Sequence, residues 1–223
     1  MLSPNSKFFF IEGNIGCGKT KFLEAVASIL KDKAQVLLEP VEKWRQTKVP
    51  GGGNVLEEFY KDPSKRAGMF NLYSTLTKVE RFFDLDPSKK IVFIERPFET
   101  DSLLFGEIGS RTGSISEIEK KVHEYFISFI KEYLQLPKTV EFVYLSCEPK
   151  ISFSRLKQRD RTEEKGVPLE YLELLNSRLE EIFRTKKLVS SDITILDVSK
   201  TFLSEKEYLE ELILPFLKQK QLL

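Results

Sequence analysis

The sequence predicts an α/β protein in which helices cover both faces of a parallel sheet. Short runs rich in aromatic and β-branched residues alternate with longer helical patterns, as expected when buried parallel strands are joined by helices. The length of 223 residues suits one domain with one core, which we expect to span residues 1–223. The predicted strands occupy residues 7–12, 35–39, 91–95, 140–146 and 193–198.

Two helix starts are marked by the local sequence. Asp62 stands before Pro63, which places a capping carboxylate ahead of a proline in the first turn. Ser116 and Glu119 form a capping box in front of an amphipathic segment, so we expect a helix over residues 118–136.

Two glycine-rich segments are expected to be mobile loops rather than linkers between domains: residues 49–54 and residues 106–114. The only histidine of the chain, His123, falls in the charged helical segment and is expected to be an exposed or half-buried helical residue. If the protein performs base catalysis, we therefore expect a carboxylate to supply the base.

Composition excludes several classes of protein. Lys and Arg number 35 against 34 Asp and Glu, so the net charge of +1 provides no overall attraction for nucleic acid or an anionic membrane. Cys17 and Cys147 show neither metal-type spacing nor a disulfide framework. The apolar run at residues 8–11 is far shorter than a membrane span of about 20 residues. We expect a soluble intracellular protein, cytoplasmic in the first instance and organellar as the alternative.

A phosphate-binding loop follows the first predicted strand. Residues 13–20 fit the pattern GxxxxGK[ST], and they lie between a buried strand and a helix, as the mechanism of this loop requires. Glycines let backbone N–H groups turn towards phosphate oxygens, Lys19 neutralises the outer phosphates and Thr20 is suited to ligate Mg²⁺. The thiol of Cys17 is interpreted as a bystander, because no partner base is near in sequence. The loop consists of Gly13, Asn14, Ile15, Gly16, Cys17, Gly18, Lys19 and Thr20.

Two further strands end in charged residues. The carboxyl ends of parallel strands border the ligand crevice, so residues there are candidates for chemistry. Glu39 is followed by Pro40, which keeps it extended and directs its carboxylate past the strand, while Trp44 follows one turn later. Glu95 and Arg96 end another apolar strand, where Glu95 is suited to hold hydrated Mg²⁺ and Arg96 to neutralise a transferring phosphoryl group. The alternatives, a solvated Glu39 beside a core Trp44 and a purely structural Glu95–Arg96 ion pair, remain open for each motif alone.

An arginine-rich segment at about residues 155–167 is interpreted as a lid. Arg155 and Arg159 share a helix face at i, i+4, whereas Arg161 joins them only if the helix loosens near Asp160. Guanidinium groups bind phosphate in a two-point manner. A solvated helix face is the alternative interpretation of such a run.

Taken together, these motifs resemble the deoxynucleoside kinase family over roughly residues 7–205. The resemblance implies a P-loop kinase fold of three layers, with a five-stranded parallel sheet flanked by helices and an arginine lid. It also implies transfer of the γ-phosphoryl group of ATP or another nucleoside triphosphate to the 5′-hydroxyl of a deoxynucleoside, with Mg²⁺, by a homodimer. The segments that carry the resemblance are GNIGCGKT, EPVEKW, GGNVLEEFY, IERPFETD and RLKQRDRTEEKGVPLEYLELL.

The resemblance also implies roles for individual residues. Glu39 matches the position of the family's general base, and Arg96 and Lys19 match its catalytic partners. Thr20 and Glu95 match the two residues that bind Mg²⁺ in the family. The implied lid arginines are Arg155, Arg159 and Arg161. The implied nucleoside-binding residues are Trp44, Leu56, Phe59, Tyr60, Asn71, Lys78, Asp101, Phe105 and Glu164, of which Tyr60 and Glu164 hold the sugar 3′-hydroxyl and Phe105 stacks on the base. Residues 197–202, with Asp197 and Phe202 at their ends, are similar to the loop around the donor base.

Two departures from the family concern the base. Asn71 stands where the family usually has glutamine, so its amide is one methylene shorter. Lys78 stands where the cytidine- and guanosine-preferring members have arginine, and it is expected to pair with Asp101. This pair favours deoxycytidine or purine deoxynucleosides.

Two other functions are compatible with parts of the pattern. A nucleoside monophosphate kinase of the thymidylate type also combines a P-loop, a strand-end acid–arginine pair and an arginine lid, but it typically has a glycine-rich turn where this chain has EPVEKW. A nucleotide-dependent regulatory module would need a switch threonine and a strand-end aspartate that the sequence does not suggest.

Overall fold

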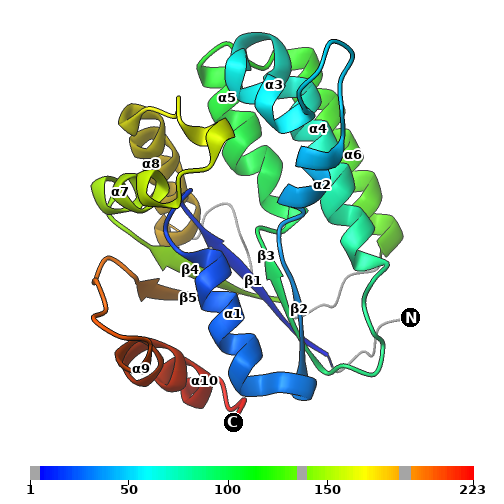
Figure 1. The fold of residues 1–223 in the computed structure, drawn as a ribbon. Helices are drawn as coiled ribbons and strands as arrows, with labels where there is room; N and C mark the ends of the chain where they lie inside the picture. The colour runs from blue at the N-terminus through cyan, green and yellow to red at the C-terminus, as the bar shows by residue number, and fades with distance from the viewer. Residues whose placement is uncertain (1–5, 135–139, 186–191) are drawn as a thin grey trace.

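Five parallel strands form the central sheet of the computed structural model, which describes residues 6–134, 140–185 and 192–223. The strand order is β2-β3-β1-β4-β5 (Figure 1). The α/β class and the parallel sheet predicted from the sequence are confirmed, and each predicted strand forms within two residues of its expected bounds. The strands are β1 Lys7–Gly13, β2 Ala34–Leu37, β3 Ile91–Glu95, β4 Val140–Ser146 and β5 Asp192–Asp197.

The sheet is buried on both faces because successive residues of a strand point to opposite sides. In β1, Phe8 and Phe10 belong to one apolar cluster, and Phe9 and Ile11 belong to the other. Strands buried in this way carry near-continuous apolar sequence, which is why the run in β1 does not alternate with polar residues.

Helices from two different parts of the chain cover the two faces. The cluster around Phe9 is closed by α1 and by the C-terminal helices η5 and α10, and the cluster around Phe8 is closed by α4, α6 and α8 (Figure 1). The helices are α1 Lys19–Leu30, η1 Lys31–Lys33, α2 Val41–Gln46, α3 Val55–Lys61, α4 Pro63–Phe82, η2 Phe98–Thr100, η3 Ser102–Gly106, α5 Glu107–Arg111, α6 Glu117–Leu134, α7 Pro149–Arg159, η4 Thr162–Glu164, α8 Leu169–Thr185, α9 Glu205–Tyr208, η5 Leu209–Ile213 and α10 Leu214–Gln219.

The predicted helix starts are found where the sequence places them. Pro63 is the first residue of α4, although the Asp62 carboxylate accepts a hydrogen bond from the Ser64 hydroxyl instead of capping a backbone N–H. Ser116 and Glu119 form the expected capping box, with bonds in both directions, at the start of α6. The last two residues of the segment 118–136 lie outside the described residues.

Two expectations are wrong. Residues 106–114 are not simply a loop, since residues 107–111 form α5, and Gly109 packs so closely on Ile115 that a Cβ would lie 2.4 Å from Ile115 Cδ1. His123 is neither exposed nor half-buried, because only 3% of its surface is accessible. Tertiary packing overrides the local signal in both places.

Helices lie beyond the carboxyl ends of the strands. Figure 1 shows α3 and α5 in the upper part of the molecule, beyond the end of the sheet at which β1 leads into α1.

Among the helices that the structure describes, none is both long and apolar enough to cross a membrane.

Candidate active site

The P-loop is a tight backbone turn that only glycine accommodates at two positions. Gly16 and Gly18 have φ values of 80° and 106°, in the left-handed region. A Cβ on Gly16 would also lie 2.3 Å from the carbonyl oxygen of Ser152. The turn delivers Lys19 to the first position of α1, where its buried ammonium donates hydrogen bonds to the carbonyl oxygens of Gly13 and Asn14, at 3.2 and 3.0 Å.

Beside the loop, a hydroxyl and a carboxylate lie in contact. The Thr20 hydroxyl donates to Glu95 Oε1 at 2.8 Å, and Glu95 Oε2 accepts from the backbone N–H of Glu39 at 3.2 Å. Burial raises the pKa of Glu95, and the charge of Lys19 opposes this rise. No group of three or more acidic, histidine or cysteine side chains arranged to bind a metal occurs in the described ranges. One carboxylate and one hydroxyl fit Mg²⁺, which prefers oxygen ligands and usually keeps water and substrate phosphates as the others.

Glu39 lies at the end of β2, between two cationic side chains. Its Oε1 is 3.2 Å from Arg96 Nε and 3.6 Å from Lys78 Nζ. Burial opposes ionisation, but the charges of Arg96, Lys78 and Lys19 outweigh it and lower the pKa of Glu39 below its ordinary value of 4.5. Glu39 is therefore a carboxylate at neutral pH, held next to Lys19 rather than on the far side of the sheet.

Arg96 connects several groups of this end of the cavity. It has a φ of 44°, an uncommon value for a residue with a side chain, immediately after β3. Its Nη2 donates to the carbonyl oxygen of Gly13 at 3.1 Å, and the guanidinium lies 5.0 Å from the centre of the Phe105 ring. Within the described residues, the buried Nη1 has no hydrogen-bond partner. A buried donor without a hydrogen-bond acceptor is uncommon in proteins and calls for an explanation.

One buried carboxylate at this end was missed from the sequence. Glu12, in β1, is fully buried, hydrogen-bonds Thr100 and lies 3.8 Å from Arg96 Nη1. Burial raises its pKa, against the charge of Arg96. The signal that could have found it is an acidic residue inside an otherwise apolar strand, directly before the P-loop.

A cavity of about 580 Å³ joins the charged groups to the nucleoside-binding candidates. Its size falls in the range of small-molecule sites. Of the predicted site residues, those that line it are Ile15, Gly16, Lys19, Thr20, Glu39, Trp44, Leu56, Phe59, Tyr60, Asn71, Glu95, Arg96, Phe105, Arg159, Arg161 and Glu164. Apolar lining residues that the sequence did not suggest include Ile108, Ile115, Val167 and Tyr171.

Aromatic side chains form one wall of the cavity. Trp44 packs edge-on against Phe70, with ring centres 5.3 Å apart, and Phe59 stacks on the same ring at 4.5 Å. The Trp44 indole N–H donates to the Thr77 hydroxyl at 2.8 Å, which fixes the ring. Burial raises the pKa of Tyr60, so its hydroxyl stays protonated at neutral pH.

An ion pair lies behind the cavity wall. Lys78 Nζ, in α4, donates to Asp101 Oδ1 at 2.6 Å, as predicted, and both side chains are buried. Burial raises the pKa of Asp101, while the Lys78 ammonium favours the ionised carboxylate. Neither residue is among those that line the cavity. Asn71, which is also buried in α4, does line it.

The lid closes over the cavity through Glu164. α7 ends at Arg159 because Asp160 adopts a left-handed conformation with φ of 49°, the loosening that the sequence requires. Arg159 Nη2 and Arg161 Nη1 then both reach the Glu164 carboxylate, at 2.6 and 3.3 Å. Both arginines line the cavity, as do Ile15 and Gly16 of the P-loop.

A second contact attaches the lid to α2. The Arg45 guanidinium donates two hydrogen bonds to Glu163, at 3.0 and 3.1 Å. Bidentate arginine–carboxylate pairs are directional as well as charged. The sequence had not suggested that either residue belongs to the site.

Arg155 does not lie with the other two lid arginines. Its guanidinium donates to the carbonyl oxygens of Cys17, Val198 and Lys200, at 3.2, 2.8 and 3.0 Å. Arg155 is absent from the cavity lining within the described part of the chain, so it lies apart from Arg159 and Arg161, and its role as a lid arginine stays a prediction. These bonds from Nη1 and Nη2 attach the 197–202 loop to the P-loop.

The donor-base candidates lie outside the cavity. Asp197 Oδ1 accepts from the backbone N–H of Ser199 at 2.9 Å, and Phe202 packs edge-on against Tyr208. Gly13, Asn14, Cys17 and Gly18 contribute backbone to the P-loop without lining the cavity. Burial raises the pKa of the Cys17 thiol, which agrees with an unreactive role.

Comparison with known proteins gives consistent matches. A family model described as deoxynucleoside kinase matches residues 9–219. The chain is 29% identical to the probable deoxycytidine kinase FPV151 of fowlpox virus (strain NVSL), over 89% of this chain and 80% of that protein. It is 30% identical to deoxycytidine kinase of Rattus norvegicus, over 93% of this chain and 89% of that protein. It is also 33% identical to mitochondrial thymidine kinase 2 of Homo sapiens, over 77% of this chain and 62% of that protein.

Proposed function

The chain belongs to the deoxynucleoside kinase family, and from this premise we propose that it transfers the γ-phosphoryl group of ATP to the 5′-hydroxyl of a deoxynucleoside. Membership makes it an enzyme that phosphorylates deoxynucleosides. The observation that carries the finer proposal is the position of Glu39, Arg96 and Lys19 around one end of a single cavity. A proton acceptor and two cations are thus available where a hydroxyl would meet a phosphate.

Glu39 is the proton acceptor in this proposal. A primary hydroxyl is a poor nucleophile, so a carboxylate within hydrogen-bond reach of the 5′-oxygen assists by taking its proton as the new bond forms. Arg96 and Lys78 keep Glu39 ionised and hold its carboxylate in one orientation. Glu95 is less suited to this role because its oxygens already bind Thr20 and the Glu39 backbone.

The cations of the site stabilise the transferring group. Charge in phosphoryl transfer is spread over the equatorial oxygens, so positioned cations contribute most of the catalysis. Lys19 would exchange its bonds to the loop carbonyls for phosphate oxygens, and Arg96 offers Nη1, which among the described residues makes no hydrogen bond and has only the 3.8 Å contact with Glu12 Oε2. Arg159 and Arg161 approach from the lid.

Thr20 and Glu95 are the residues that would hold Mg²⁺. When bound, the ion would supply positive charge and orientation to the donor phosphates. The Thr20–Glu95 contact keeps both oxygens on the P-loop side of the cavity.

The sugar is proposed to lie between Tyr60 and Glu164. Both line the cavity, and Tyr60 carries a protonated hydroxyl. A donor and an acceptor that converge on the 3′-oxygen would be left unpaired by a sugar that lacks this group, and such a loss is strongly discriminating.

The base is proposed to lie against the aromatic wall, with Asn71 at its edge and Phe105 across its face. Our preference is deoxycytidine or a purine deoxynucleoside, because the cytidine- and guanosine-preferring members of the family have a cation at the position of Lys78, which here pairs with Asp101. Replacing Asn71→Gln should then alter the ranking among deoxynucleosides by adding one methylene at the base edge.

The experiment that tests the proposed function is a turnover panel. The four natural deoxynucleosides and their 5′-monophosphates are each incubated with ATP and Mg²⁺, and product is identified by mass. We expect deoxynucleoside 5′-monophosphates as products, with deoxycytidine or a purine deoxynucleoside the preferred acceptor. Turnover of monophosphates alone would instead indicate a thymidylate-type kinase.

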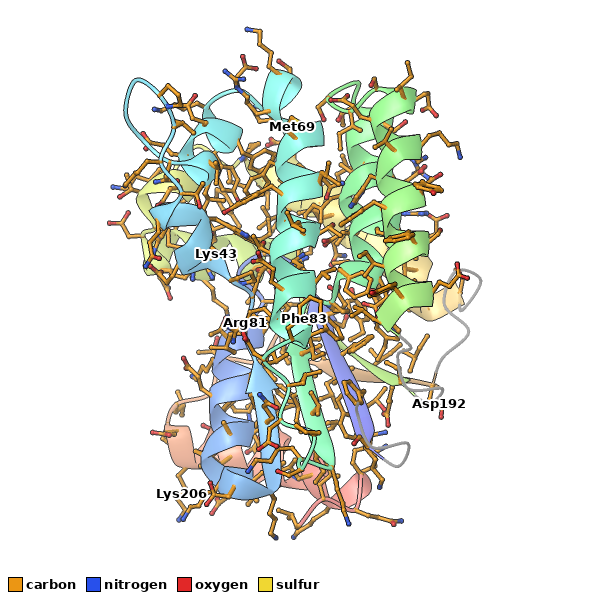
Figure 2. All side chains as sticks on the ribbon, turned by 90° about the vertical axis from the view of Figure 1, so that its right-hand side faces the viewer. Lys43, Met69, Arg81, Phe83, Asp192 and Lys206 are labelled. Carbon is orange, nitrogen blue, oxygen red and sulfur yellow. The ribbon has the colours of Figure 1, made fainter. Side chains whose placement is uncertain are left out.

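We also propose that the enzyme is a homodimer, as the family resemblance implies. Exposed apolar side chains follow α4 at seven-residue spacing: Met69 is 71% exposed, Leu76 is 45% exposed, and Phe83, just past the helix end, is 72% exposed. Figure 2 looks onto this helix, with α6 beside it. α6 exposes a second stripe, consisting of Ile118, Val122, Tyr125, Phe129 and Tyr133.

A second copy of the chain is the proposed occupant of this surface. Two neighbouring helices with parallel apolar stripes can pack against the same pair in a copy related by a two-fold axis, so that one patch covers itself. Light scattering should give the mass of two chains, and Phe129→Glu should give the mass of one. A monomeric wild-type protein at micromolar concentration would contradict the proposal.

A further inference from the structure

A buried chain of hydrogen bonds runs from Asp101 to Asn71 behind the cavity wall. The Thr75 hydroxyl lies 2.8 Å from Asp101 Oδ2 and 2.7 Å from His123 Nε2. The other ring nitrogen, His123 Nδ1, lies 3.1 Å from Asn71 Nδ2. All four side chains are buried, and the proposed reaction gives Thr75 and His123 no task.

The chain of hydrogen bonds forms because three elements of the fold meet at this point. Asn71, Thr75 and Lys78 stand at i, i+4 and i+7 of α4, so they share one helix face. α6 packs on this face and contributes His123, and the segment between η2 and η3 contributes Asp101.

The direction of each hydrogen bond follows from the charged end of the chain. The Asp101 carboxylate only accepts, so the single proton of the Thr75 hydroxyl points to Asp101, and the Thr75 oxygen must accept from the N–H of His123 Nε2. Burial and the charge of Lys78 lower the pKa of His123 to about 4, which leaves the ring neutral at pH 7. Its Nδ1 is then an acceptor.

This arrangement fixes the Asn71 amide. An acceptor at His123 Nδ1 requires the NH₂ group of Asn71 to turn towards it. The amide oxygen must then point away from His123. Asn71 lines the cavity where the base is proposed to lie.

A fixed amide distinguishes the two pyrimidine patterns. At adjacent ring positions cytosine offers an acceptor and an amino donor, whereas thymine offers a donor and a carbonyl acceptor. An amide that is free to flip by 180° complements both, but one held in a single orientation complements only one of them. We infer that the Asp101–Thr75–His123 chain is a specificity device, in which Thr75 and His123 are positioning residues that set the orientation of the Asn71 amide. This inference rests on the proposed function, since it concerns the base of the same substrate.

The first part of the test needs no activity. Because His123 is the only histidine, the imidazole ¹⁵N signals of an untagged, labelled protein come from one ring. We expect the neutral Nε2–H form at pH 7. Thr75→Val removes the hydroxyl and should convert the ring to the Nδ1–H form, which can then donate to a flipped Asn71. Thr75→Ser, the matched control, keeps the hydroxyl and should keep the Nε2–H form.

The second part measures discrimination. The ratio of kcat/KM for deoxycytidine and thymidine should move towards one by about ten-fold in Thr75→Val, the scale of one well-made pair of hydrogen bonds at a base edge. Thr75→Ser should stay within about two-fold of the wild-type ratio, on the same scale.

The outcomes separate the inference from the proposed function. An Nδ1–H ring in the wild-type protein would overturn the inference even if Thr75→Val cannot be purified. A wild-type ratio near one, or an unchanged ratio in Thr75→Val with a converted ring, would overturn it as well. Absence of turnover with every deoxynucleoside would reject the proposed function, and the ring signals would still report whether the hydrogen-bond chain exists.

Discussion

The two ends of the cavity are built from different kinds of structure. The charged end, which consists of Lys19, Glu39, Glu95 and Arg96, comes from the P-loop and from the ends of β2 and β3. The nucleoside end comes from α2, α3, α4 and the lid, whose side chains meet only because these helices pack over the sheet. Parallel strands end at one edge, so the first end follows from the topology, whereas the second depends on helix packing.

Chemistry and selectivity are therefore held by separate scaffolds that contact each other. One link between them is Lys78, on α4, whose Nζ lies 2.6 Å from Asp101 Oδ1 and 3.6 Å from Glu39 Oε1. Another is the Arg96 guanidinium, which lies 5.0 Å from the centre of the Phe105 ring. Changes at the charged end should therefore act mainly on kcat, and changes at the nucleoside end mainly on KM and substrate preference.

The largest effect is expected from Glu39→Gln. Removing the proton acceptor while keeping the shape should lower kcat by about 10²- to 10⁴-fold. The dissociation constant of the deoxynucleoside, measured by calorimetry without ATP, should change little. Glu80→Gln, at a surface ion pair with Lys43, is the matched control and should leave both values unchanged. An unaltered kcat in Glu39→Gln would remove this residue from the reaction.

Lys78→Gln breaks one link between the two ends. Since the Lys78 ammonium lowers the pKa of Glu39, its loss should raise this pKa and move the acidic limb of the kcat/KM profile to higher pH. In the wild-type enzyme the pKa of Glu39 is lower than 4.5, the ordinary pKa of a glutamate, so Glu39 becomes protonated and stops acting as a base only below pH 4.5. Lys78→Arg keeps the charge and should keep the wild-type profile. The link is refuted if the two variants share one profile.

Arg45→Met should loosen the lid without altering the charged end of the cavity. Loss of the bidentate contact to Glu163 should raise the KM for the deoxynucleoside about three- to ten-fold, the scale of one ordinary hydrogen bond, with a smaller change in kcat. Lys43→Met, at a solvent-exposed ion pair on the same helix, is the control. Equal KM values for the two variants would show that the Arg45–Glu163 contact does not contribute to binding of the deoxynucleoside.

Glu99→Gln should affect stability at basic pH and leave both ends of the cavity intact. Its carboxylate oxygens are buried without hydrogen-bond partners in the described ranges, and burial raises its pKa to about 8. The folded state thus holds a proton between about pH 4.5 and 8 that the unfolded chain releases, so the stabilisation present at low pH is lost as the pH rises through this window.

Thermal unfolding measures this effect. Glutamine carries no ionisable proton, so Glu99→Gln should raise Tm by about 2–4 °C at pH 8.5, and the difference should shrink at pH 5. A constant difference across this range would mean that Glu99 titrates normally.

The charged end could be predicted from the sequence because its parts are contiguous motifs. GNIGCGKT, the Glu39–Pro40 strand end and the Glu95–Arg96 pair each lie directly after an apolar run, and the parallel sheet brings their ends to one edge. The direction of Arg155 could not be predicted in this way, because it is set by carbonyl oxygens from two other segments of the chain.

The hydrogen-bond chain to Asn71 was missed because α6 is apolar on two faces. Ile127 and the buried His123 face the core, while larger apolar side chains such as Tyr125 and Phe129 face outwards. Hydrophobic periodicity alone cannot tell which apolar face is internal. A polar residue on the inner face of a helix becomes interpretable only when its partners on α4 are known.

The most direct test of the account is a structure with a deoxynucleoside and a non-hydrolysable ATP analogue bound. The account predicts that the nucleoside 5′-oxygen lies within about 3.2 Å of the Glu39 carboxylate, or is joined to it by one water, and faces the terminal phosphate at Lys19. A nucleoside bound elsewhere, or with its 5′-oxygen turned away from Glu39, would contradict the central claim that the two ends of the cavity form one site.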